Sequence, residues 1–160
     1  MKYVGAIVLI IAVFAAWRIY CSFLGAQLDS VRSFLSALSD YREKVRCYLC
    51  APAEWASAYA DKDTAVSELT AQLADGKGFL EAYESVKDRF YLTQKADDAL
   101  RTCLSRLGTG YLETELEVLA SGIDSLDREE RHLCEEVERR RRAVGALLGA
   151  IAMGMVILII

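Results

Sequence analysis

The stretch from Leu24 to Leu49, LGAQLDSVRSFLSALSDYREKVRCYL, decides the fold class of this chain. Apolar residues recur along it at steps of three and four, which is the spacing of one stripe along an α-helix. The stripe consists of Leu24, Leu28, Val31, Leu35, Leu38, Val45 and Leu49, with Tyr41 or Arg42 in its gap. Because a proline disfavours the helical conformation in the preceding residue, Pro52 predicts that a helix over 18–51 ends there.

A second stretch near the other end of the chain repeats this spacing. Its stripe consists of Leu112, Leu116, Leu119, Ile123, Leu126, Leu133 and Val137, with Glu130 in its gap. Helices over 18–51 and 111–142 would each be about 50 Å long. Two helices of equal length can pack antiparallel along their stripes, so we predict a pair of long antiparallel helices.

The residues between these two helices are expected to form short helices. Two long helices alone bury only a narrow stripe, so the intervening segments must widen the core. We expect about four short helices, over 52–60, 64–74, 79–90 and 93–107, with turns at Gly76–Gly78 and Gly108–Gly110. One proline and ten glycines in 160 residues are too few for the turns of an all-β sandwich or barrel. The sequence therefore predicts an all-α helical bundle.

Both ends of the chain are apolar. The runs Tyr3–Trp17 and Ala143–Ile160 contain no charged residue. As helices they would span about 22 and 27 Å, slightly less than the roughly 30 Å hydrocarbon core of a bilayer, and snorkelling of Arg18 with local thinning can make up the difference. We predict transmembrane anchors over 1–17 and 143–160, each continuous with a long helix.

A cleaved signal peptide is the alternative for the first apolar run. Processing requires small residues at the cleavage site, whereas Trp17 and Arg18 are bulky and the helical pattern continues past them. Tyr3 and Trp17, at opposite ends of the run, fit the aromatic anchors found at membrane interfaces. These features favour an anchor that is retained.

Both apolar runs have basic residues next to them on the side that faces the middle of the sequence. Arg18 adjoins the first run, and Arg139, Arg140, Arg141 and Arg142 adjoin the second, whereas the terminal sides contribute Lys2 alone. Cytoplasmic flanks carry the excess of basic residues, so we expect the middle, 18–142, to be cytoplasmic and both termini to lie across the membrane. Topogenic and lipid-headgroup roles account best for the four arginines. A nucleic-acid patch is less favoured, because the middle contains 18 basic and 23 acidic residues.

The patterns that suggest catalysis or metal binding are weak. Cys47 and Cys50 form a C-x-x-C motif, but at a predicted helix C-terminus, where the helix dipole opposes a thiolate. His132 and Cys134 are two residues apart on a helix and point in different directions, so they do not readily complete a zinc site with this pair. Gly76-x-Gly78 lacks the preceding strand and the third glycine of a phosphate-binding loop. We therefore predict no catalytic site, cofactor or metal, and a protein that is not an enzyme.

Gly145 and Gly149 form a G-x-x-x-G motif in the second apolar run. Small residues at this spacing allow two helices to approach closely in lipid. The motif predicts a helix contact, either with the first run or with another subunit, although glycine is common in membrane helices in any case.

The chain resembles the stage III sporulation protein AB family of endospore-forming bacteria, because its features occur in the same order along the sequence. The resemblance covers the whole chain: a short span that opens on Lys-x-x-Gly, a long helix leading to a proline-started segment, Leu107-Gly108, and a C-terminal span that ends in ILII. In this family Leu-Gly is followed by Ser-Asp, Glu and then Gln. Here Leu107, Gly108 and Glu113 match that pattern, whereas Gly110 and Tyr111 replace Ser-Asp and Glu115 replaces Gln.

The resemblance implies a component of the channel-like complex that assembles between mother cell and forespore during sporulation. It places the protein in the mother-cell membrane, the outer forespore membrane. It also implies that the cytoplasmic helical domain is similar to that of the platform proteins of type II secretion and type IV pili. The expected partner is a secretion-type ATPase encoded beside it.

Two hypotheses of function follow. In the first, the protein is a membrane assembly platform that docks the ATPase, with candidate interface residues Arg42, Lys44, Arg46, Leu107, Gly108 and Glu113. In the alternative, the protein is a structural membrane scaffold whose long helices self-associate as a coiled coil, without an ATPase partner.

Overall fold

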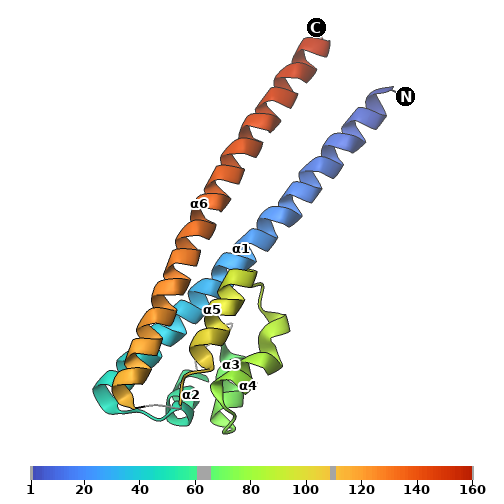
Figure 1. Ribbon diagram of the computed structural model, residues 1–160. Helices are drawn as coiled ribbons and strands as arrows, with labels where there is room; N and C mark the ends of the chain where they lie inside the picture. The colour runs from blue at the N-terminus through green and yellow to red at the C-terminus, as the bar shows by residue number, and fades with distance from the viewer. Residues whose placement is uncertain (1, 61–65, 109–110, 160) are drawn as a thin grey trace. The chain divides into compact units, whose positions relative to one another are not determined.

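The computed structural model describes the backbone of residues 2–60, 66–108 and 111–159 (Figure 1). The regular structure in these ranges is helical throughout, which confirms the predicted all-α fold. The elements are α1 (Lys2–Tyr48), α2 (Pro52–Ala60), α3 (Ser67–Ala74), α4 (Phe79–Val86), the 3-10 turn η1 (Lys87–Arg89), α5 (Gln94–Leu104) and α6 (Leu112–Ile159). The predictions for Thr64 and Gly110 fall outside the described residues.

The chain divides into two compact units. One comprises Met1–Gly25 and Arg131–Ile160, and the other comprises Ala26–Glu130. As predicted, each apolar end is continuous with a long helix, because α1 and α6 run unbroken from one unit into the other. Within the described residues, no helix combines the length and the apolar character that crossing a membrane requires.

Helix α1 ends at Tyr48, three residues before the end that Pro52 predicted. Leu49 has a φ of 52°, in the left-handed region, and its N–H still donates to the Val45 carbonyl at 3.2 Å. This conformation turns the chain away from the helix axis. The prediction that Leu49 belongs to the buried stripe was therefore wrong, and its side chain is 72% exposed.

Within the second unit, only part of each apolar stripe is buried, and Leu112, which was predicted to belong to the α6 stripe, is 40% exposed. On α1, Val31, Leu38 and Val45 are buried, and Tyr41 fills the gap in the stripe while Arg42 is exposed. On α6, the buried members are Leu119 and Leu126. In the gap of the α6 stripe, Glu130 accepts from Arg32 Nε at 2.7 Å. The two long helices therefore contact each other directly, and Arg32 lies opposite Glu130.

The short helices pack around α1 mainly through aromatic rings. Phe34 contacts Tyr83 of α4 edge-on, with ring centroids 5.9 Å apart, and Phe90 at 4.7 Å. Tyr41 contacts Trp55 of α2 at 4.9 Å and Phe79 of α4 at 5.2 Å. Of these six rings, all except Phe90 are buried. Because each such ring buries a large apolar surface, this cluster is the centre of the core.

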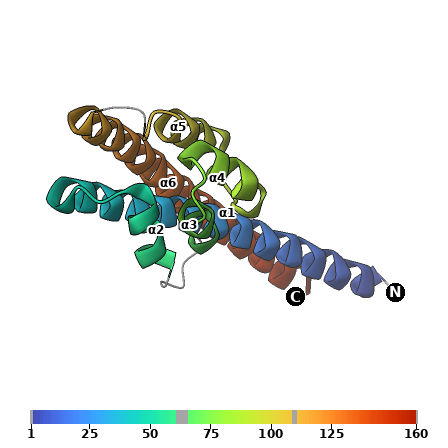
Figure 2. The same cartoon turned by 90° about the horizontal axis from the view of Figure 1, so that it is seen from below.

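Helix α5 lies beside the N-terminal part of α6 in both views (Figures 1 and 2). It begins at an N-cap, where the Thr93 hydroxyl oxygen accepts from the Ala96 N–H at 3.2 Å. The same hydroxyl donates to Glu129 of α6 at 2.8 Å. At the other end of α5, the Cys103 thiol donates to the Val118 carbonyl at 3.7 Å. These two contacts fix α5 on α6 at both of its ends.

In the first unit, α1 and α6 also contact each other. Leu24 of α1 and Leu133 of α6 are buried. The Arg140 guanidinium lies over the ring of Tyr20, 5.3 Å from its centroid, and Tyr20 in turn lies beside Trp17 at 6.3 Å. A cation over an aromatic face is attracted by the ring quadrupole, so Arg140 helps to hold the two helices together.

Candidate partner-binding surface

Four large apolar side chains are exposed where α1 ends and where α6 begins. They are Tyr48, Leu49, Tyr111 and Leu112, with exposed fractions of 74%, 72%, 89% and 40%. The end of α1 and the start of α6 lie at the same end of the second unit in both views (Figures 1 and 2). We call these four residues the apolar tip. Exposed apolar surface marks interaction sites on proteins, so the apolar tip is the leading candidate for contact with a partner.

The three basic residues predicted as one cluster are exposed but face different neighbours. Arg42 lines a groove between α1 and α6. Lys44 lies over the ring of Tyr48, 5.5 Å from its centroid, on the side of α1 that faces α2. Residues two apart on a helix point in nearly opposite directions, which is why the sequence run does not form a single patch. Arg46, on the last turn of α1, is exposed.

The structure has a turn at Leu107 and Gly108, as was predicted for Gly108. The main polar contact of this turn comes from a residue that the sequence analysis did not select. Leu107 is buried, and Gly108 has a φ of 79°, which glycine adopts without strain. The Gly108 N–H donates to the Glu115 Oε1 at 2.8 Å. Glu113, the acidic residue selected from the sequence, is exposed on the first turn of α6. The sequence signal that could have identified Glu115 is an acidic residue in the first turn of a helix, when that helix comes directly after a glycine turn.

A pocket of about 400 Å³ lies between the end of α1 and α2, next to the apolar tip. The Trp55 indole Nε1 donates to Asp40 Oδ2 at 2.8 Å and so ties α2 to α1 at this pocket. Cys50 and Glu54 also line it. Burial, followed by the nearby carboxylate of Glu54, raises the pKa of the Cys50 thiol. This thiol is therefore held in its protonated form, which is the opposite of what a redox-active cysteine requires.

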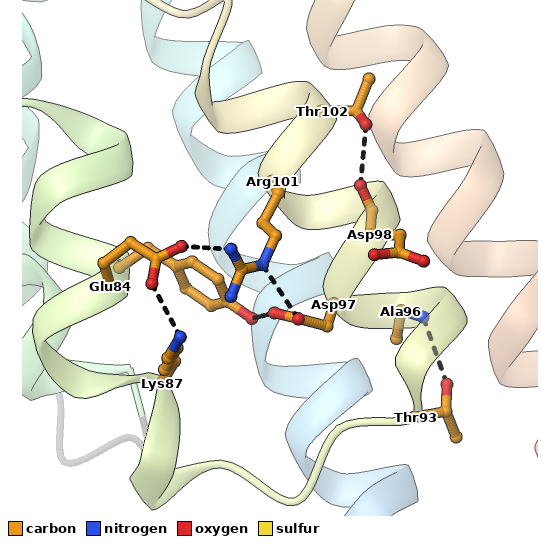
Figure 3. Close-up of polar contacts among 9 residues, drawn as sticks. Glu84, Lys87, Thr93, Ala96, Asp97, Asp98, Arg101 and Thr102 are labelled. Carbon is orange, nitrogen blue, oxygen red and sulfur yellow. Dashed lines mark hydrogen bonds and ion pairs between the residues drawn. The ribbon is translucent and has the colours of Figure 1, made fainter.

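A polar network fixes α4 against α5 (Figure 3). Arg101 of α5 lies between Glu84 and Asp97, at 2.5 Å from Glu84 and 2.9 Å from Asp97, and Lys87 contacts Glu84 at 2.9 Å. The Tyr83 hydroxyl donates to Asp97 Oδ1. The network lies between the two short helices, so we assign it to the rigidity of the bundle.

Two ionisable groups of this network have shifted pKa values. Burial and the hydrogen bond to Asp97 raise the pKa of Tyr83 well above its usual value. Burial alone would also raise the pKa of Asp97, but hydrogen bonds from Tyr83 and Arg101 lower it below its usual value. Asp97 is therefore a carboxylate near neutral pH, in the form that accepts from both partners.

The cysteines and acidic residues form no metal-binding group in the described part of the chain. No three His, Cys, Asp or Glu side chains converge there on a point where an ion could bind. The five cysteines are free thiols, including the exposed Cys47 and the half-buried Cys50 of the C-x-x-C motif.

The residues selected for membrane topology and helix packing lie in the first unit. Arg18, Arg139, Arg141 and Arg142 are exposed, and Arg140 is half-buried over Tyr20. Arg142 also pairs with Glu138, one helical turn away, at 2.7 Å. A Cβ atom at Gly145 would meet no other atom within 4 Å. The surroundings of Gly149 fall outside what the structure describes.

The structure thus defines a class of protein: an all-helical bundle built on two long terminal helices, with the short helices α2 to α5 between them and an apolar tip at one end. Residues 2–160 match the family described as stage III sporulation protein AB. The chain therefore belongs to the stage III sporulation protein AB family, which confirms the resemblance seen in the sequence. The comparisons with curated proteins and with solved structures found no match.

Proposed function

We propose that this protein is a non-enzymatic platform component of the channel-like complex between mother cell and forespore, and that it docks a cytoplasmic secretion-type ATPase. Membership of the stage III sporulation protein AB family supports a role in sporulation. The observation that carries the docking proposal is the apolar tip, where Tyr48, Leu49 and Tyr111 are each more than two-thirds exposed.

The composition of the apolar tip suits a protein interface. Tyrosine is among the residues that contribute most to binding energy, because it buries a large ring at little entropic cost and keeps a hydroxyl for hydrogen bonding. Arg46, exposed on the last turn of α1, provides a charge at the edge of this surface. Charges at the rim of an interface mainly set the association rate and the choice of partner.

The docking proposal is tested by measuring binding between the purified full-length chain in detergent and the ATPase encoded beside it. We expect Tyr111→Ser to weaken binding by about tenfold or more, since it removes the most exposed ring of the apolar tip. Tyr91→Ser is the matched control, because Tyr91 is also exposed, at 54%, but follows η1 and lies outside the apolar tip. Equal affinities for both variants, or no association of the native chain at tens of micromolar, would count against docking at this surface.

We also propose that the apolar ends of α1 and α6 anchor the protein in the mother-cell membrane, with the second unit in the cytoplasm. The uncharged runs Tyr3–Trp17 and Ala143–Ile160, with arginines on their central sides, support this arrangement. The test is labelling of intact cells with a thiol reagent that cannot cross the membrane. Cys47 is the suitable native reporter because it is exposed, whereas Cys103 is buried.

The labelling experiment compares Cys47 with a cysteine introduced after Ile160. We expect only the introduced cysteine to react in intact cells, and Cys47 to react once the cells are permeabilised. Reaction of Cys47 in intact cells, with the introduced cysteine protected, would invert the topology and remove the ATPase from reach.

A further inference from the structure

One side of the long helix pair in the second unit has an open groove. It has a volume of about 440 Å³, and all of its lining residues come from α1 and α6, among them Leu35, Ser39 and Arg42 on α1 and Ala120, Ile123 and Asp124 on α6. Leu35 and Ile123 belong to the apolar stripes of their helices but remain only half-buried. Val31, Leu38, Leu119 and Leu126 of the same stripes are buried, whereas this groove exposes apolar side chains to solvent.

The register of the two helices determines which groove residues share a level. Arg32 pairs with Glu130 at 2.7 Å. The helices are antiparallel, so a residue further along α1 from Arg32 lies beside the residue that precedes Glu130 on α6 by the same number of positions. Ser39 therefore lies beside Ile123, and Arg42 lies beside Ala120. Ser39 and Ala120 are small, so another helix could approach the groove closely.

The groove carries opposite charges at separated positions. Arg42 is exposed on the α1 side. Arg42 lies beside Ala120 of α6, and Asp124 is four residues further along α6. Four residues span about 6 Å of a helix, which is within the reach of an arginine side chain. Asp124 pairs with Arg128 on its own helix at 3.0 Å, but these side chains are 69% and 71% exposed, and an ion pair so exposed rearranges at little cost.

We propose that this groove is a self-association surface, which packs against the same groove of a second copy around a two-fold axis parallel to the helices. In this pair, α1 of each copy lies against α6 of the other at the same level, and the four helices form one core. Leu35 and Ile123 of each copy become covered. A two-fold axis brings the same patch of both copies together, so the patch must be self-complementary, and a groove that carries Arg42 on one helix and Asp124 on the other meets this requirement.

The test is the association state of the full-length chain in detergent, measured by sedimentation with the ATPase absent. We expect the native chain to be a dimer. Arg42→Glu places like charges against Asp124 of the other copy, and Asp124→Arg places like charges against Arg42. Each variant alone should therefore dissociate at about tenfold higher concentration than the native chain.

A mixture of the two variants makes the test specific to this interface. In a dimer of one Arg42→Glu chain and one Asp124→Arg chain, the two reversed charges meet each other at one contact, and the native Arg42 and Asp124 meet at the other contact. The mixture should therefore form a mixed dimer close to native strength, whereas a dimer of two identical variant chains has like charges at both contacts. Lys95→Glu, at an exposed position on α5, is the control charge reversal and should leave association unchanged.

Three outcomes would overturn the proposal: a native chain that is monomeric, single variants that associate as strongly as the native chain, or a mixture no stronger than either variant alone. Circular dichroism of each variant distinguishes loss of association from loss of folding. Since no ATPase is present, these outcomes are independent of whether the apolar tip docks one.

Discussion

Cys103 on α5 and Gly122 on α6 are so close that a Cβ atom at Gly122 would lie 2.5 Å from the Cys103 Sγ and 2.9 Å from its Cβ. Real Cβ atoms do not approach other atoms this closely, so the contact between the two helices depends on the absence of a side chain at Gly122. The glycine also explains how a buried thiol reaches the Val118 carbonyl of α6.

Gly122→Ala should destabilise the second unit. Overpacking a well-packed contact costs about 1–3 kcal/mol, and the better helix propensity of alanine offsets about 1 kcal/mol of this. Urea unfolding of the full-length chain followed by circular dichroism measures the change. Gly25→Ala is the matched control, because a Cβ there meets nothing within 4 Å, and this variant should be slightly more stable than the native chain. Equal stability of the two variants would contradict the close contact.

Glu115→Ala should destabilise the turn before α6. The substitution removes the acceptor of the Gly108 N–H, and such a hydrogen bond contributes about 1 kcal/mol. Glu113→Ala, on the same turn of the helix, should change the free energy of unfolding by less than about 0.5 kcal/mol. Glu115→Gln keeps an acceptor oxygen and should retain most of the stability. The same unfolding measurement compares the three variants, and a larger effect at Glu113 than at Glu115 would contradict the assignment.

Asp97 should make the stability of the bundle depend on acidic pH. Its folded pKa lies below the unfolded value of about 3.9, so the stability that it contributes is fully present above that pH and is lost as pH falls through the folded pKa. Asp97→Asn removes this contribution, and its stability should therefore fall less steeply between about pH 5 and pH 3. Tyr83→Phe removes one of the hydrogen bonds that lower the pKa of Asp97 and should give an intermediate profile. Parallel pH profiles for the native chain and Asp97→Asn would contradict this role.

Cys103 should react with thiol reagents far more slowly than Cys47. Burial raises the pKa of Cys103 to about 11 and leaves its side chain 4% exposed, whereas Cys47 is exposed. At pH 8 the fraction of thiolate at Cys103 is lower by about a hundredfold than at an ordinary cysteine, so it should react in the slowest phase. Cys103→Ala should abolish that slow phase and leave the fast phase of Cys47 unchanged. Rapid labelling of Cys103 in the folded chain would contradict its burial against α6.

The long helices could be predicted from the sequence because their signal is periodic. A stripe with steps of three and four defines a helix and its buried face, and Val31, Leu38, Leu119 and Leu126 are buried as this predicts. The short helices lie where they were predicted, but α5 ends at Leu104 rather than Leu107, and α4 ends at Val86 rather than Phe90. Its helical conformation changes to a 3-10 turn at Lys87, and the periodicity of a few residues does not distinguish the two.

The contacts between elements could not be predicted, because they depend on which helices become neighbours. Phe34 falls outside the stripe of α1, but it is buried because α4 covers a wider face of α1 than one stripe. The charged run at Arg42 and Lys44 appears as one cluster in the sequence, but α6 and α2 approach α1 from different sides and separate the two residues. Glu115 acquires its role from the position of Gly108 on the preceding turn.

Leu49 shows how stability and recognition can oppose each other at a single residue. Its left-handed backbone costs a non-glycine residue about 1–2 kcal/mol, and its side chain remains in water without contributing to the core. A glycine at this position would make the isolated chain more stable. Leucine instead leaves the isolated chain with an unfavourable hydration energy that is released when another surface covers it. Leu49→Gly should therefore raise the melting temperature and weaken docking at the same time, so that the most thermostable variant of this position would be the poorest binder.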